Sequence, residues 1–237
     1  MLRGEAGTDK TIVGYHYLTA GVEAGDSCLF VAFEESAKDV RANAATLGLD
    51  LSGVELLDLS PDAERFLDED QYSVFAPDKV ESASVTDEIV DAVERVDPDR
   101  VFVDPITQLG YLSADDFQFR QEVAGLMAYL EEGGATTLFT TQPTSARPDD
   151  DLQYICDGSI TLARGPTGRT LSVDKFRGSG FRSGRHALRI DGTGITVYPK
   201  LVPGDHAREF DLDRISSGVA ELDAGLGGGV ERGPVTV

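Results

Sequence analysis

The sequence has little of what a secreted, disulfide-stabilised or membrane-spanning protein needs. It holds two cysteines and no tryptophan in 237 residues. The two cysteines, Cys28 and Cys156, are too few for a disulfide framework or a metal site, and Cys28 lies in an apolar run typical of a buried thiol. No apolar run is long enough to cross a bilayer, and the N-terminus lacks an apolar signal segment. We therefore expect a cytoplasmic protein with no membrane partner.

Lysine is scarce as well, and negative charge dominates. The only lysines are Lys10, Lys38, Lys79, Lys175 and Lys200, whereas 42 acidic residues set a net charge of −21. This balance argues against a surface that coats nucleic acid, which needs clustered Lys and Arg. An acidic excess spread along the chain is typical of adaptation to high salt, where self-repulsion is screened. We therefore expect a halophilic source and no nucleic-acid partner.

An apolar content of 41% allows a sizeable core, and its pattern predicts an α/β fold. Short apolar runs are typical of buried parallel strands, and they lie at 28–33, 54–60, 100–105 and 135–142. Helical composition and spacing mark 36–48, 84–96 and 115–132, whereas 61–83 is assigned to no element. Beyond residue 150, alternating segments separated by glycines favour antiparallel strands. The order predicts a mostly parallel central sheet flanked by helices, with an antiparallel C-terminal extension.

The segment RGEAGTDKT at 3–11 carries most of a phosphate-binding loop. The pattern is G-x-x-x-x-G-K-[ST], and Gly4, Lys10 and Thr11 are in register with it. In such a loop, successive backbone N–H groups surround the phosphates and a helix begins at the lysine. The lysine reaches the β- and γ-phosphates, and the threonine hydroxyl holds Mg²⁺. The expected nucleotide-binding residues are Gly4, Gly7, Thr8, Asp9, Lys10 and Thr11.

One residue departs from this pattern, because Asp9 replaces the second glycine. We expect its amide to face phosphate from the first turn of the helix, in the α region that is open to Asp, and its carboxylate to cap that helix. A carboxylate a few ångströms from a polyphosphate is repelled by about 4 kcal/mol at an effective dielectric of about 20. The sequence is compatible with a functional loop and with a damaged one.

Three acidic residues follow predicted strands, at the ends where ligands gather in parallel sheets. Asp104 ends VFVDP, where a carboxylate would orient Mg²⁺ or its water shell; an Asp-Pro turn is the simpler alternative. Glu34 and Glu35 end VAFEES, where they could polarise the water that attacks a γ-phosphate. In so acidic a protein, a solvated loop is the alternative.

A pair of cations lies in DKFRGSGF. Lys175 and Arg177 point to the same face of an alternating strand, so both can reach one anion. They could supply charge to a neighbour's phosphate, as an arginine finger does, or they could neutralise local acids. The histidines His16, His186 and His206 have no metal-ligand spacing.

The order of these motifs resembles the KaiC-like branch of the RecA superfamily of ATPases. The resemblance covers nearly the whole chain, and its most specific parts are the glutamate pair, YICDG and the Lys-x-Arg-Gly element. It implies a RecA-like P-loop NTPase that binds ATP and Mg²⁺ at the subunit interfaces of a homo-oligomeric ring, usually a hexamer, in a signalling or regulatory role with a further protein partner. It also implies a role for each candidate: Glu34 and Glu35 as catalytic carboxylates, Thr11 and Asp104 at the metal, and Lys175 with Arg177 on a neighbour's nucleotide.

The two ends of the chain depart from the family order. The family opens with a glycine-rich segment and a strand before the phosphate loop, and RISSGVAELDAGLGGGVERGPVTV resembles that opening but stands at 214–237. We expect an ATPase domain over 1–203 that lacks its first strand, then a linker and the opening of a second such domain over 204–237. Residues 235–237 would supply the strand if the tail docks on its own chain or a neighbour's. Together with Asp9, this leaves a degenerate, non-catalytic nucleotide-binding or scaffold domain as the alternative to an active ATPase.

Overall fold

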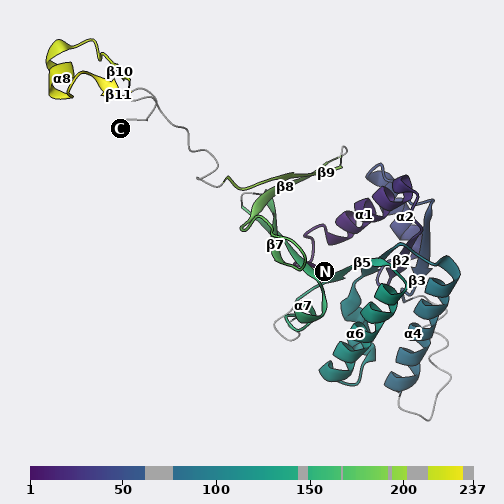
Figure 1. Ribbon diagram of the computed structural model, residues 1–237. Coiled ribbons are helices and arrows are strands. Elements are labelled where there is room, and N and C mark those ends of the chain that lie inside the picture. The colour runs from purple at the N-terminus through teal and green to yellow at the C-terminus, as the bar shows by residue number, and fades with distance from the viewer. Residues whose placement is uncertain (62–76, 144–148, 167, 192–193, 202–212, 232–237) are drawn as a thin grey trace. The chain divides into compact units, whose positions relative to one another are not determined.

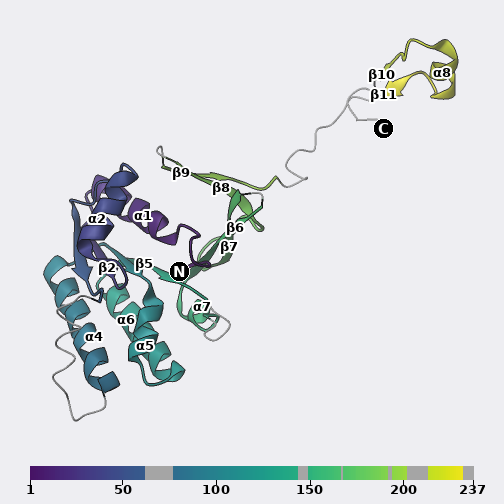
Figure 2. The same cartoon turned by 180° about the vertical axis from the view of Figure 1, so that it is seen from behind.

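The computed structural model describes residues 1–61, 77–143, 149–166, 168–191, 194–201 and 213–231, with side chains left undescribed at 77–84 and 231. The chain divides into two compact units, Met1–Lys200 and Leu201–Val237. Figures 1 and 2 show the elements of both units.

The first unit is built around one sheet, whose order within the described residues is β3-β2-β4-β5-β1-β6-β7-β8-β9. The strands are β1 (Leu2–Arg3), β2 (Cys28–Ala32), β3 (Val54–Asp58), β4 (Arg100–Asp104), β5 (Thr136–Thr141), β6 (Gly158–Gly165), β7 (Gly168–Phe176), β8 (His186–Asp191) and β9 (Gly194–Tyr198). Every pairing from β3 to β6 is parallel, and the pairings from β6 to β9 are antiparallel. The predicted α/β fold class is confirmed.

Helices cover the parallel part of the sheet on both faces. They are α1 (Lys10–Ala24), α2 (Ala37–Thr46), α4 (Pro77–Val96), α5 (Leu109–Leu112), α6 (Asp116–Glu132) and α7 (Leu152–Ile155), with a 3₁₀ turn at Ile106–Gln108. Figures 1 and 2 show α1 and α2 on one face and α4 and α6 on the other. The Ser36 hydroxyl caps α2 by accepting from the Asp39 amide, and the Asp115 carboxylate caps α6. Helix α4 begins at Pro77, earlier than the predicted 84.

The two faces of the sheet carry separate hydrophobic clusters because side chains alternate along each strand. On β2, Leu29 and Val31 pack in the cluster that α4 and α6 cover, whereas Phe30 packs in the cluster that α1 and α2 cover. The Phe30 and Phe102 rings lie 4.9 Å apart between centroids in the second cluster. Burial on both faces explains why the strands read as continuous apolar runs rather than as an alternation.

Helix α1 approaches the sheet closely at Gly14. A Cβ on this residue would overlap the buried Phe102 ring of β4. We predict that Gly14→Ala lowers the free energy of unfolding by about 1–3 kcal/mol, the usual cost of overpacking a core. The matched control is Gly125→Ala in α6, where a Cβ meets open space and should instead stabilise by about 0.5–1 kcal/mol. Denaturant unfolding of both variants measures this difference, and equal stabilities would contradict it.

The first strand, which we expected to be absent, is present as two residues. Leu2 and Arg3 pair in parallel with Thr140–Thr141 of β5 and with Ile160–Thr161 of β6. Leu2 is buried, and it packs against Leu162 and Leu188. This corrects the expectation of a domain without its N-terminal strand. Residues 235–237, the expected substitute, lie outside the described residues.

The second unit is a small folded segment. Strands β10 (Arg214–Ile215) and β11 (Val230–Glu231) pair antiparallel around α8 (Ala220–Gly225). The Asp223 carboxylate accepts from the Ser217 amide at 2.8 Å, which holds the turn before α8. In the part of the chain that the structure describes, no helix has the length and apolar character to span a membrane.

Candidate functional site

The loop between β1 and α1 is a tight backbone turn held by its own side chains. The Thr8 hydroxyl donates to the Glu5 carbonyl at 2.8 Å, and Thr8 is buried. Gly7 has a φ of 74°, a conformation that glycine adopts without strain. A Cβ on Gly4 would lie 2.7 Å from the Leu162 carbonyl oxygen of β6, so that position also requires glycine. The loop therefore has a fixed shape, with α1 beginning at its end.

The Lys10 side chain lies inside this loop. It is 5% exposed, and its Nζ donates to the carbonyls of Gly4 at 2.8 Å and Glu5 at 3.0 Å. Burial lowers the pKa of the Lys10 ammonium, while the nearby charges of Asp104 and Glu34 oppose that shift. The loop therefore holds a largely desolvated cation near two acidic side chains.

Thr11 and Asp104 meet at the carboxyl ends of the strands. The Thr11 hydroxyl donates to Asp104 Oδ2 at 2.5 Å, and the buried Thr140 hydroxyl of β5 donates to Asp104 Oδ1. Burial raises the pKa of the Asp104 carboxyl, against the opposing effects of both hydroxyls and of the Lys10 charge. The structure thus brings together the two residues expected at the metal. A hydroxyl and a carboxylate are oxygen ligands of the kind Mg²⁺ takes alongside substrate phosphates, so the donor set fits this ion.

The raised pKa of Asp104 makes a prediction about stability. The folded protein holds a proton on this carboxyl more tightly than the unfolded chain does, so the charged form costs stability at neutral pH. That cost shrinks as the pH falls below the folded-state pKa, and it is gone below the lower pKa of the unfolded chain. We predict that Asp104→Asn raises the Tm of the nucleotide-free protein at neutral pH, and that the gain shrinks toward acid pH. Thermal unfolding across pH measures it.

The control is Asp87→Asn, which removes one charge from an exposed position on α4 and so reports general relief of charge repulsion. The Asp104→Asn gain should exceed the Asp87→Asn gain at neutral pH. If Asp104→Asn lowers the Tm at every pH, the carboxylate stabilises the fold and this interpretation is wrong.

The two glutamates lie beside Thr11 and Asp104. Glu34 and Glu35 follow β2, and with Thr11 and Asp104 they line a hollow of about 30 Å³. Glu34 Oε1 accepts from Gln108 Nε2 at 2.9 Å, and Glu35 Oε2 accepts from Asn43 Nδ2 at 3.0 Å. Both glutamate side chains are exposed, and each is oriented by one amide donor. Both carboxylates therefore lie at the hollow.

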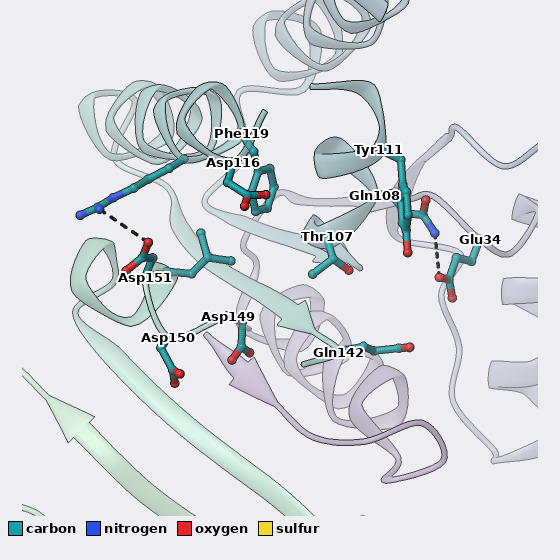
Figure 3. Close-up of a pocket in the computed structure, with 12 residues that line it drawn as sticks. Glu34, Thr107, Gln108, Tyr111, Asp116, Phe119, Gln142, Asp149, Asp150 and Asp151 are labelled. Carbon is teal, nitrogen blue, oxygen red and sulfur yellow. Dashed lines mark hydrogen bonds and ion pairs between the residues drawn. The ribbon is translucent and has the colours of Figure 1, made fainter. Parts of the chain in front are cut away.

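A larger cavity of about 260 Å³, at the carboxyl ends of β4 and β5, is lined in part by Glu34. Figure 3 shows Gln108 directed toward Glu34 on one side of it and Asp149, Asp150 and Asp151 on the other. Asp149 is 3% exposed and forms an ion pair with Arg3 of β1. Glu34 lines both the hollow and this cavity.

Asp9 departs from expectation in both backbone and side chain. Its φ is 68°, in the left-handed region and not the right-handed α region, and its side chain makes no capping hydrogen bond to α1. Aspartate is among the few residues other than glycine that tolerate this conformation. The carboxylate instead forms an ion pair with Nε of Arg169 on β7. At the second-glycine position, Asp9 thus adopts a backbone conformation that suits glycine. Arg169 balances the charge of the Asp9 carboxylate.

Lys175 and Arg177 both bind the segment around α7. Lys175 Nζ donates to the carbonyls of Gln153 at 2.5 Å and Cys156 at 2.8 Å. Arg177 donates to the Tyr154 carbonyl and to Asp157, each at 3.1 Å. Within one chain, Lys175 binds backbone carbonyls, and only Arg177 also pairs with an acidic residue, Asp157. They lie apart from the hollow that Thr11, Asp104 and the glutamates line.

Four residues around the site were not predicted from the sequence: Asn43, Gln108, Thr140 and Arg169. Thr140 lies inside an ordinary apolar strand pattern, and only the pairing of β5 with β1 and β4 aims it at Asp104. Arg169 is one of several arginines beyond residue 150. The only available signal was indirect, since an acid inside a phosphate loop needs a cation nearby.

A phosphate loop between the first strand and helix of a parallel sheet, with a hydroxyl and a carboxylate converging beyond it, defines a P-loop nucleotide-binding protein. The family model described as "ATPase: KaiC" matches residues 1–202, and the chain belongs to this family.

Similar proteins agree with that assignment. The chain is 29% identical over 245 residues to the "Circadian clock oscillator protein KaiC" of Parasynechococcus marenigrum, covering 97% of this chain and 46% of that protein. It is 31% identical over 216 residues to a "UPF0273 protein" of Aeropyrum pernix, covering 85% and 86% respectively. The chain thus spans about half the length of the KaiC relatives.

Proposed function

We propose that this chain binds Mg-ATP and hydrolyses its γ-phosphate bond, in a regulatory role. The observation that carries the proposal is the convergence of Thr11, Asp104 and the two glutamates on one hollow, next to the buried Lys10 ammonium. These are the parts that phosphoryl transfer to water requires: a cation and a metal for the phosphates, and a base for the water.

Each residue has a distinct role in this proposal. Lys10 exchanges the Gly4 and Glu5 carbonyls for phosphate oxygens, with a net gain because an ammonium binds an anion more strongly than a neutral carbonyl. Thr11 and Asp104 hold Mg²⁺, which neutralises charge that develops on the phosphates. Glu34 or Glu35 accepts the proton of the attacking water, and Gln108 and Asn43 orient the two carboxylates.

The finer assignments rest on family membership. We propose a ring of identical subunits, a hexamer, in which Lys175 and Arg177 reach a neighbour's nucleotide. In that arrangement they would also present the 153–157 segment to the interface. A signalling protein partner, a cytoplasmic location and a halophilic source complete the proposal, and the net charge of −21 supports the last of these.

The organisation of the chain is a further part of the proposal. We propose that residues 1–203 form the ATPase domain and that 204–237 are a linker and the opening segment of a second KaiC-like domain. The family match over 1–202 and the separate compact unit beyond Lys200 support this division.

The second candidate is a nucleotide-binding or oligomeric scaffold without catalysis, and Asp9 in the phosphate loop is the observation that favours it. Two observations count against this candidate: Asp9 has a glycine-like backbone conformation, and its carboxylate forms an ion pair with Arg169. Calorimetric titration of the purified chain with Mg-ATP in multimolar KCl tests the binding half of the proposal. Saturable binding that needs Mg²⁺ supports it, and no heat of binding would contradict it.

A further inference from the structure

Arg169 lies on an element that touches the phosphate loop from outside the parallel sheet. It belongs to β7, where it is paired in register with Arg164 of β6 and Leu188 of β8. The Leu162 carbonyl of β6 closely approaches Gly4, and Leu162 packs in one cluster with Val13 of α1. The β6–β8 strands therefore form a wall beside the loop and the start of α1.

The ion pair between this wall and the loop is partly buried. The Asp9 side chain is 15% exposed and the Arg169 side chain 31% exposed, and Nε of Arg169 donates to Asp9 Oδ2. Charges in such a partly buried place are screened less by salt than surface charges are. We therefore expect Arg169 to offset the repulsion between Asp9 and a neighbouring anion even at high salt concentration.

The pair also engages the Asp9 carboxylate away from the first turn of α1. Aspartate at the start of a helix commonly accepts from backbone amides of the first turn, and those amides are also what a phosphate binds. The Asp9 side chain makes no such bond, although it stands at the first residue before α1. Arg169 holds the carboxylate and leaves the amides of that turn without a side-chain cap from Asp9.

We propose that Arg169 is a positioning residue for nucleotide binding: it neutralises Asp9 and holds its carboxylate off the amides at the start of α1, so that a loop with aspartate at its second-glycine position still accepts a polyphosphate. This inference rests on the proposed function, because it concerns how the same loop binds Mg-ATP. Arg169 acts through Asp9 and needs no contact with the nucleotide itself.

The test is a cycle of three variants, Arg169→Gln, Asp9→Gly and the double variant, titrated with Mg-ATP by calorimetry in multimolar KCl. Glycine at this position suits the φ of 68° and removes the carboxylate. We expect Arg169→Gln to bind about tenfold more weakly or worse, a difference of about 1.4 kcal/mol. Asp9→Gly should bind at least as tightly as the wild type. The double variant should return to within about threefold of the wild type, because both charges are gone together.

A purely structural role for the ion pair gives a different pattern. All three variants break the link between β7 and the loop, so in that case all three bind more weakly, and this result would overturn the proposal. Unchanged binding by Arg169→Gln would also overturn it. The control is Arg189→Gln on β8, which removes a cation paired with Asp191 in the same antiparallel extension and should leave binding unaltered.

The failure of this inference is distinguishable from that of the proposed function. If the wild type and all variants bind no Mg-ATP, the proposed function fails and this inference falls with it. If the wild type binds but the predicted order of affinities is absent, the inference alone fails. Should Arg169→Gln not fold, as judged by its unfolding transition, the Asp9→Gly variant decides: weaker binding than the wild type contradicts the proposal, and equal or tighter binding supports it.

Discussion

Replacing Lys10 by methionine is expected to weaken Mg-ATP binding by about 10- to 100-fold. A hydrogen bond to a charged group contributes about 1.5–3 kcal/mol, and each tenfold change in Kd corresponds to about 1.4 kcal/mol. Methionine keeps the apolar stem of the side chain in the buried loop but removes the ammonium that donates to the Gly4 and Glu5 carbonyls. Calorimetric titration with Mg-ATP measures the change.

The control for this prediction is Lys38→Met. Lys38 is an exposed lysine on α2, so its replacement changes the net charge equally without touching the loop. It should bind Mg-ATP like the wild type. If Lys10→Met also binds with wild-type affinity, the Lys10 ammonium does not reach the phosphates, and the loop is not a phosphate site.

The second large effect is expected at the glutamates. We predict that Glu35→Gln lowers ATP turnover by about 100-fold or more while leaving the Kd for Mg-ATP nearly unchanged. Glutamine keeps the size of the side chain but cannot take a proton from water, and a positioned base commonly contributes about 10²- to 10⁴-fold. Measurement of the turnover rate at saturating Mg-ATP, beside a binding titration, separates a loss of chemistry from a loss of affinity.

A matched variant guards against a general charge effect. Glu55→Gln on β3 removes an exposed carboxylate that pairs with Arg95 at 2.9 Å, away from the hollow. Its turnover should equal that of the wild type. Turnover that is unchanged in Glu35→Gln would show that Glu35 is not the base. The same measurement on Glu34→Gln then tests the neighbouring glutamate. In the wild type, the Glu34 carboxylate accepts a hydrogen bond from Gln108.

Much of the fold could be predicted because its signals are local. The buried strands at Cys28–Ala32 and Arg100–Asp104 are continuous apolar runs, and the helices carry their own capping residues, such as Ser36. Strand β1 could not be predicted, since two residues carry no periodicity. Its place between β5 and β6 depends on pairings with residues more than a hundred positions away.

The residues of the site show the same contrast between local signals and distant contacts. Lys10, Thr11 and Asp104 were predicted, because the loop motif and the ends of parallel strands have fixed relations to one another. The charge balance at Asp9 could not be predicted. Arg169 is 160 positions away from Asp9 in the sequence, and the residues around Arg169 do not indicate its partner. The expected repulsion of about 4 kcal/mol applies to an unpaired Asp9 carboxylate beside a polyphosphate. The Asp9 carboxylate is paired with the Arg169 guanidinium, so that value does not apply.

The most direct test of the proposed ATPase activity is whether the purified chain releases inorganic phosphate from Mg-ATP in multimolar KCl. We predict steady release that depends on Mg²⁺, saturates with ATP and falls to the background rate in Lys10→Met. The folded state of both proteins is checked by their unfolding transitions in the same buffer. Release by the wild type no faster than by Lys10→Met would contradict the account, and it would leave a scaffold whose phosphate loop no longer performs chemistry.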